Sequence, residues 1–191
     1  MKLAAWILLA APVALLGQGT YTIDPAHSSA QFSVKHLMVS NVKGTFSGVK
    51  GSVTFDPNNL PGSKVEATID VTTISTQEPK RDAHLKSPDF FEVEKYPTMA
   101  FVSKQFFREG NRLKVKGDLT MHGQTKEVVF DVDGPTQEVK TPMGVRVGAT
   151  VSGTINRKDW GLNWNRAIET GGVVVGDEVK ITIEVEATKK S

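Results

Sequence analysis

Hydrophobic and polar residues alternate along most of this 191-residue chain from residue 20 onward. The clearest run is 179–187, where valine, isoleucine and alanine at the odd positions alternate with lysine, threonine and glutamate at the even ones. The same period of two recurs at 65–71, 112–121, 128–132 and 145–151. Such alternation is typical of β-strands that bury one face and expose the other to water. The pattern therefore predicts an all-β protein.

Residues that favour turns separate these runs, and many of the gaps are short enough for antiparallel hairpins. The separators include Asp56-Pro57-Asn58-Asn59, Gly110-Asn111, His122-Gly123, Asp133-Gly134-Pro135, Pro142-Met143-Gly144 and Gly176-Asp177. About eight strands with one apolar face each pack either as a sandwich or as a closed barrel. Closure removes exposed strand edges. We therefore predict a single antiparallel β-barrel of about eight strands.

One segment near residues 79–92 interrupts the alternation and predicts a short helical insert. Pro79 to Lys86 reads as a helix, because proline suits the first turn. Ser87-Pro88 then begins a second turn that carries Phe90 and Phe91. A helix this short is not stable alone, so we expect it to pack on an end of the barrel. No repeat or linker divides the chain, which predicts one domain over 20–191.

The first 19 residues have the order of a secretory signal peptide. Lys2 is basic, residues 3–16 are apolar except for Pro12, and glycine follows at positions 17 and 19. The apolar run is shorter than the roughly 20 residues that span a bilayer. We therefore expect cleavage after Gly17 or Gly19, and a periplasmic or secreted protein with no membrane anchor. Gln18 stands where a lipidated cysteine would be, which excludes a lipoprotein anchor.

The composition excludes several kinds of chemistry. The chain has no cysteine, so it has neither disulfides nor thiolate sites. Its 23 basic and 21 acidic residues are spread along the sequence and give no support for a nucleic-acid partner. Signatures of hydrolases, phosphate loops, dinucleotide sites and zinc proteases are missing. Asp24 and Asp82 lie near His27 and His84 in sequence, but the same residues fit turns and a solvated helix face. We therefore predict no metal, no cofactor and no catalytic residue.

The inward positions of the strands are candidates for a ligand-binding lumen. Many are valine, alanine or threonine, which is compatible with space inside an eight-stranded barrel. The thirteen lumen candidates are Phe32, Val34, Val53, Phe55, Ile69, Val71, Phe90, Phe91, Phe101, Leu119, Phe130, Val147 and Ile183. Seven polar or aromatic candidates for the mouth are His27, His36, Arg81, Asp82, His84, Trp160 and Trp164.

Several motifs, in a fixed order, resemble those of the YceI-like polyisoprenoid-binding proteins. They are Asp24-Pro25-Ala26-His27-Ser28, Phe32-Ser33-Val34-Lys35-His36-Leu37, the segment from Arg81-Asp82-Ala83-His84-Leu85 to Phe90-Phe91, and Asn156-Arg157-Lys158-Asp159-Trp160-Gly161. The resemblance covers essentially the whole chain after residue 20. It implies an extended, lipocalin-like antiparallel barrel with a short helical insert, which encloses a long isoprenoid or another long amphiphile. Typical members of the family are periplasmic.

The leading hypothesis is therefore a non-enzymatic carrier or sequestering protein for a long-chain isoprenoid, a quinone or a fatty-acyl amphiphile. One alternative is an enzyme that acts on such a lipid, with Asp82, His84 or His27 in acid–base roles. Another is a structural or stress-response barrel with a filled core and no ligand. The sequence does not identify the lipid or the open end of the barrel, and it leaves a homodimer open.

Overall fold

The computed structural model describes residues 18–167 and 171–190. The strands are β1 (Gly19–Ile23), β2 (Ser29–His36), β3 (Ser40–Phe46), β4 (Lys50–Phe55), β5 (Lys64–Asp70), β6 (Thr98–Glu109), β7 (Arg112–Met121), β8 (Gln124–Asp133), β9 (Val139–Thr141), β10 (Gly144–Asn156) and β11 (Val175–Lys189). The helices are α1 (Pro79–Lys86) and three 3₁₀ turns, η1 (Leu60–Gly62), η2 (Val71–Thr73) and η3 (Arg157–Trp160). Residues 1–17 of the expected signal peptide lie outside the described residues, so the signal peptide stays a prediction.

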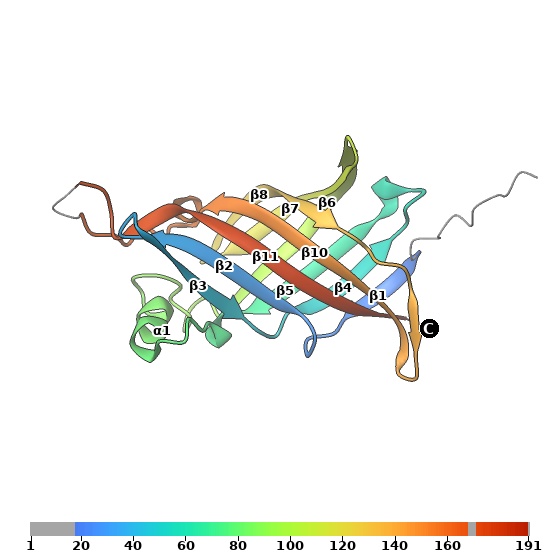
Figure 1. The fold of residues 1–191 in the computed structure, drawn as a ribbon, viewed down its shortest axis with the longest axis horizontal. Coiled ribbons are helices and arrows are strands. Elements are labelled where there is room, and N and C mark those ends of the chain that lie inside the picture. Colours follow the sequence, from blue (N-terminus) through green and yellow to red (C-terminus); the bar gives the residue numbers. More distant parts are fainter. Residues whose placement is uncertain (1–17, 168–170, 191) are drawn as a thin grey trace, which may run out of the picture.

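Eight strands close into an antiparallel barrel, as the alternation predicts (Figure 1). Around the wall the order is β1, β4, β5, β6, β7, β8, β10 and β11, and β11 pairs again with β1. Strands β2 and β3 lengthen one side of the barrel, because β2 pairs with the first half of β11 and β1 with its last residues. The short strand β9 pairs only with the start of β10.

The helical insert packs on one end of the barrel, also as predicted. Glu78 begins α1 by accepting hydrogen bonds from the backbone N–H groups of Lys80 and Arg81. Beyond the helix, Phe91 meets the ring of Phe46 edge-on at 5.7 Å between ring centroids. Phe91 and Leu85 both pack against the main buried cluster of the barrel. The insert therefore fills and closes this end.

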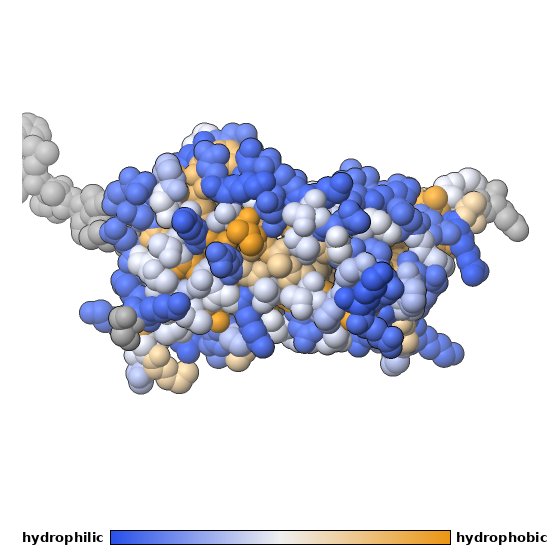
Figure 2. All heavy atoms as spheres, turned by 180° about the vertical axis from the view of Figure 1, so that it is seen from behind, coloured by the Kyte–Doolittle hydropathy of each residue, from blue (hydrophilic) through white to orange (hydrophobic). Residues whose placement is uncertain are grey.

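The outer face of the barrel is mostly hydrophilic. Figure 2 shows the side opposite to that of Figure 1, where apolar colour reaches the surface near the centre and in smaller spots toward both ends. Lys104 Nζ on β6 lies 2.6 Å from Asp118 Oδ1 on β7 and 3.3 Å from Glu127 Oε2 on β8. No helix in the described part of the chain is both long and apolar enough to span a bilayer.

Candidate functional site

The barrel encloses an apolar cavity of about 150 Å³. All eight barrel strands contribute to its wall of 24 residues, none of which is charged. The wall is apolar because these strands turn their hydrophobic positions inward and their polar positions to water. An apolar cavity of this volume holds a ligand about the size of benzene. The cavity is therefore suited to hydrocarbon.

The structure places eight of the thirteen lumen candidates on this wall. They are Val53, Phe55, Ile69, Phe101, Leu119, Phe130, Val147 and Ile183. Whether they contact a ligand stays a prediction, but their inward orientation follows directly from the period of two.

The other five lumen candidates do not line the cavity, because they lie toward the end that the helical insert fills. Val71 is buried in the core, within η2 rather than on β5. Phe32 and Phe91 pack against the same core. The ring centroid of Phe90 lies 5.1 Å from that of His84 and 5.2 Å from that of Trp164. Val34 lies on β2, paired between β3 and the first half of β11.

Sixteen lining residues were not among the predicted set. They are Tyr21, Ile23, Val49, Val65, Ala67, Met99, Ala100, Phe106, Val115, Val132, Pro135, Gly148, Ala149, Val151, Val185 and Ala187. Many continue an alternation whose other members were predicted, as Val65 and Ala67 do before Ile69. The same phase could have found them. Pro135 and Gly148 carry no such signal.

A wider groove of about 760 Å³ adjoins the cavity. Five residues line both voids: Pro135, Val147, Gly148, Ala149 and Val185. The rest of the groove is largely polar and includes His27, Asp133, Arg146, Glu184 and Glu186. The groove lies toward the C-terminal end of β11, away from α1 (Figure 1). Apolar and polar surfaces thus meet at one place, as a site for an amphiphile requires.

A segment that we term the strap, residues 134–141, crosses this junction. Thr136 donates its backbone N–H to the Gly148 carbonyl at 2.8 Å, and its Oγ1 accepts the Gly148 N–H at 3.0 Å. Glu138 accepts hydrogen bonds from the Tyr21 hydroxyl at 2.8 Å and from Lys189 Nζ at 2.6 Å. Tyr21 is itself a lining residue of the cavity and is only 1% exposed. The strap is therefore tied directly to the cavity wall.

The electrostatics of this tie follow from its partners. Burial, and secondly the hydrogen bond to Glu138, raise the pKa of Tyr21 far above its ordinary value, so the phenol stays a donor. The hydrogen bond from Lys189, followed by that from Tyr21, lowers the pKa of Glu138. Glu138 is therefore an anion that accepts from both sides.

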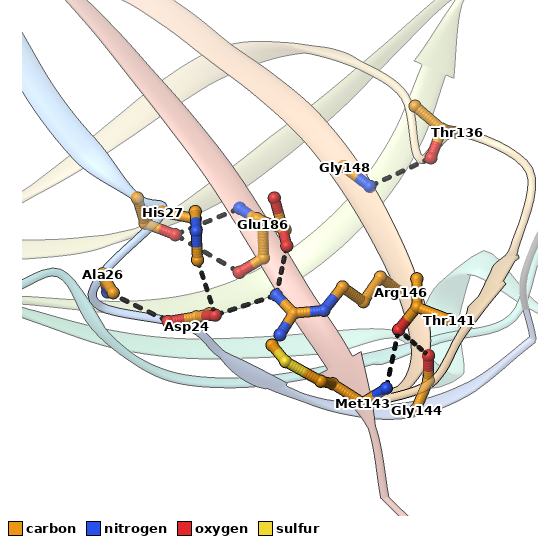
Figure 3. Close-up of polar contacts among 11 residues, drawn as sticks. Asp24, Ala26, His27, Thr136, Thr141, Met143, Gly144, Arg146, Gly148 and Glu186 are labelled. Carbon is orange, nitrogen blue, oxygen red and sulfur yellow. Dashed lines mark hydrogen bonds and ion pairs between the residues drawn. The ribbon is translucent and has the colours of Figure 1, made fainter.

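Beside the groove, four side chains form an ion-pair cluster (Figure 3). Arg146 Nη1 donates to Asp24 Oδ2 at 2.8 Å and also to Glu186 Oε1. His27 Nδ1 lies 2.9 Å from Asp24 Oδ2. Ligand atoms of Asp24, His27 and Glu186 fall within 4.8 Å of one another, as in a metal site. However, the Arg146 guanidinium already supplies the cation that these carboxylates need, so the geometry favours an ion-pair cluster.

This cluster predicts a pH dependence of stability. Hydrogen bonds from His27, then Arg146, then the Ala26 N–H hold the pKa of Asp24 well below its usual range. A lowered pKa stabilises the fold above the unfolded-state value of about 3.9, and this contribution is lost as the pH falls toward the folded-state pKa. Asp24→Asn should therefore lower the thermal midpoint at neutral pH, and its difference from wild type should shrink below about pH 4. Midpoints measured between neutral and strongly acidic pH test this, and a constant difference would contradict it.

The seven mouth candidates do not gather at one opening, which corrects the sequence-based grouping. Only His27 lines the groove. Trp160 is 1% exposed and donates its indole N–H to the Leu119 carbonyl at 3.0 Å, so it belongs to the core. His36 ends β2, where it pairs with Ser40. The physical reason is that the insert closes its end of the barrel instead of framing an entrance.

The other four mouth candidates hold the closed end together. They are Arg81, Asp82 and His84 on the insert, and Trp164. Arg81 Nε donates to Thr76 Oγ1 at 2.7 Å, and Asp82 Oδ1 accepts the Thr76 N–H at 2.8 Å. His84 Nε2 lies 2.8 Å from Asp89 Oδ2, and its ring meets Trp164 edge-on at 4.9 Å. Neither Asp82 nor His84 lines the cavity or the groove. The acid–base roles considered for them therefore gain no geometric support.

Comparison with known proteins shows consistent similarity. A family model described as a YceI-like domain matches residues 21–187. A UPF0312 protein of Staphylococcus epidermidis is 46% identical over 168 residues, which is 87% of this chain and 95% of the relative. The solved structure of the Campylobacter jejuni YCEI protein is similar with a TM-score of 0.68 and 33% identity, over 82% of this chain and 90% of that one. A polyisoprenoid binding domain from Saccharophagus degradans shares the fold, with a TM-score of 0.65 and 14% identity over 89% of this chain and 98% of that domain.

Proposed function

Because the chain belongs to the family of YceI-like domains, we propose that it is a lipid-binding protein that holds the hydrocarbon tail of its ligand inside the barrel. The observation that carries this proposal is the enclosed cavity with 24 lining residues and no charge. Burial of hydrocarbon contributes about 0.8 kcal/mol for each CH₂ group, so a tail needs no polar partner in the wall.

The proposed ligand is a long-chain isoprenoid, with a quinone or a fatty-acyl amphiphile as close chemical relatives. The likeness to the polyisoprenoid binding domain of S. degradans supports this choice. Selection for tail length should be loose, because one methylene is worth only about 1–3 kcal/mol even in a shaped pocket. The polar head, which we place in the groove near His27 and Glu184, provides the remaining selectivity.

A long tail needs more room than the cavity provides in its present form. The groove supplies that room, since it shares five wall residues with the cavity and is about 760 Å³ in volume. Displacement of the strap would join the two voids, because Pro135 and Gly148 line both the cavity and the groove. Pro135 is part of the strap, and the Gly148 backbone bonds Thr136 of the strap. We therefore propose that the ligand enters beneath the strap and leaves its head in the groove.

This route predicts an effect on ligand exchange. Glu138→Gln removes the charge that accepts from Tyr21 and Lys189, so the strap should open more often. Association and dissociation of a fluorescent long-chain fatty acid should both accelerate several-fold in stopped-flow measurements, while the dissociation constant changes less. Lys140→Gln is the matched control, because it changes charge on an exposed neighbour in the same strap. Equal rates in wild type and Glu138→Gln would contradict entry beneath the strap.

We also propose that the protein acts after export, as a carrier or sequestering protein without catalysis. The basic, apolar and small residues in sequence order at the N-terminus support export. The uncharged wall of the cavity supports binding over chemistry at the tail, because acid–base catalysis needs a titratable group at the reacting atoms.

Native mass spectrometry of the purified mature protein, followed by organic extraction and lipid identification, tests the proposal. A stoichiometric long-chain species in the extract is the expected result. A clean ligand-free mass, together with no uptake of added polyprenyl lipids, quinones or fatty acids, would overturn it and favour the barrel without a ligand. Conversion of an added lipid into a new product would favour the enzyme alternative.

A further inference from the structure

The turn between β2 and β3 exposes three consecutive apolar side chains. Leu37, Met38 and Val39 are 38%, 54% and 79% exposed. The turn is tight, since Val39 donates its N–H to the His36 carbonyl at 3.1 Å and the strands pair again at His36 and Ser40. Among the other exposed large apolar residues in the described ranges, no two are adjacent in sequence. We term residues 37–39 the β2–β3 tip.

The backbone of the tip is unfavourable for the residues it carries. Leu37 and Met38 have φ angles of 50° and 63°, in the left-handed region that side chains with a Cβ rarely adopt. Hairpin turns with two left-handed residues favour asparagine and glycine. The β7–β8 turn of the same protein follows this preference more closely, with φ angles of 49° at His122 and 71° at Gly123. Strained backbone beneath exposed apolar side chains indicates a role other than folding.

The hairpin that carries the tip is exclusively basic in its charged residues. From Ser29 to Phe46 it contains Lys35, His36 and Lys43 but no aspartate or glutamate, although the whole chain is nearly balanced in charge. Both lysines are exposed. Arg166, also exposed, is joined to the tip through Val174, whose carbonyl accepts the Leu37 N–H and whose N–H bonds Arg166. The nearest part of β11 carries two acidic residues, Asp177, which pairs with Lys158 at 2.8 Å, and Glu178, and Lys180 follows farther along the strand.

We propose that the β2–β3 tip docks the protein on the surface of an anionic lipid bilayer. Apolar side chains flanked by lysine and arginine are the composition of interfacial anchors, since the apolar groups insert at the acyl boundary and the cations meet anionic headgroups. Leu37, Met38 and Val39 supply the apolar part. The tip lies at the same end as α1 (Figure 1), so docking turns the capped end of the barrel toward the bilayer. This surface is independent of any ligand in the lumen.

Vesicle co-sedimentation of the mature protein tests the proposal. Wild type should bind vesicles of phosphatidylglycerol and phosphatidylcholine more strongly than vesicles of phosphatidylcholine alone. The double variant Leu37→Asn with Met38→Gly should have an affinity for the anionic vesicles that is lower by at least about tenfold. Its thermal midpoint should be unchanged or higher. The new residues suit the left-handed backbone, so lost binding cannot be attributed to unfolding.

Two further variants separate the apolar and charged contributions. Val129→Thr removes an apolar side chain that is 45% exposed on β8, and it should bind vesicles like wild type. The double variant Lys35→Gln with Lys43→Gln should lose the preference for anionic vesicles, because each lysine removed should lower the affinity for them about fivefold. The proposal is overturned if wild type binds neither kind of vesicle, or if the tip variant binds like wild type. It is also overturned if the tip substitutions change only the oligomeric state, which would make a second copy of the chain the partner.

Discussion

Ala67→Trp is expected to abolish uptake of long-chain lipids while leaving the barrel folded. Ala67 lines the cavity on β5 and pairs with Phe101 on β6. An indole side chain at this inward position would occupy a cavity of about 150 Å³, which has room for a ligand about the size of benzene. Because the new side chain enters an existing void, the cost of overpacking should be small. The barrel then resembles one with a filled core.

Thr68→Trp is the matched control, because neighbouring residues of a strand point to opposite faces. Thr68 is exposed on the outside of the same strand. Fluorescence titration with a long-chain polyene fatty acid should show at least about tenfold weaker binding for Ala67→Trp and no change for Thr68→Trp. Ile69→Glu provides a second approach, since an unpaired carboxylate in the uncharged wall should also abolish lipid retention. Wild-type lipid content in either folded inward variant would remove the cavity as the binding site.

The period of two in the sequence was sufficient to predict strands and their inward faces. Residues 179–187 lie on β11, and 128–132 lie on β8, with the hydrophobic positions facing the cavity or core. The same rule fails at Val71, where β5 has already ended. Asp70 there accepts hydrogen bonds from both the N–H and the hydroxyl of Thr72, which starts a 3₁₀ turn. Local capping thus overrides a pattern that still looks like a strand.

The location of the junction between the cavity and the groove could not be predicted, because it depends on contacts between distant segments. Alternation shows which face of a strand is buried, but it does not show which end of a barrel is closed. The closed end depends on Phe91 reaching Phe46, and the strap depends on Tyr21 bonding Glu138, 117 positions away. Sequence reasoning identified the helical insert correctly, yet treated its polar residues as a mouth, whereas Arg81 and Asp82 bond Thr76, just before the insert, and His84 pairs with Asp89.

The stretch 156–161 shows how a motif noticed for function has a structural role. Asn156 accepts the Lys158 N–H at 3.0 Å and so begins η3, and Gly161 ends it with a φ of 77°. Between them, Arg157 is only 4% exposed. Its side chain donates to backbone carbonyls of Gly176 at 2.9 Å, Val175 at 3.4 Å, and Leu162. The motif therefore joins the segment after β10 to the start of β11.

Arg157→Ala should consequently cost about 3–5 kcal/mol in the free energy of unfolding. Burial lowers the pKa of the guanidinium and the charge of Asp177 opposes this shift, but an arginine stays charged at neutral pH. Its removal takes the guanidinium donor away from the carbonyls of Gly176 and Leu162 and leaves a void, whereas the Val175 carbonyl keeps the hydrogen bond from Asn165 Nδ2 at 2.7 Å. Urea unfolding followed by tryptophan fluorescence measures the loss directly, because Trp160 is buried beside the altered residue.

Lys158→Ala provides the comparison that separates the effect of burial on the free energy of unfolding from the effect of charge. Lys158 is the next residue and pairs with the same Asp177, at 2.8 Å compared with 3.6 Å for Arg157. Its side chain is 44% exposed, so water replaces the lost pair and the expected cost is about 0–1 kcal/mol. Distance alone would rank the lysine as the stronger pair, whereas the buried hydrogen bonds rank the arginine first. Equal losses for the two variants would show that the ion pair with Asp177, rather than the bonds to the carbonyls, fixes this corner of the barrel.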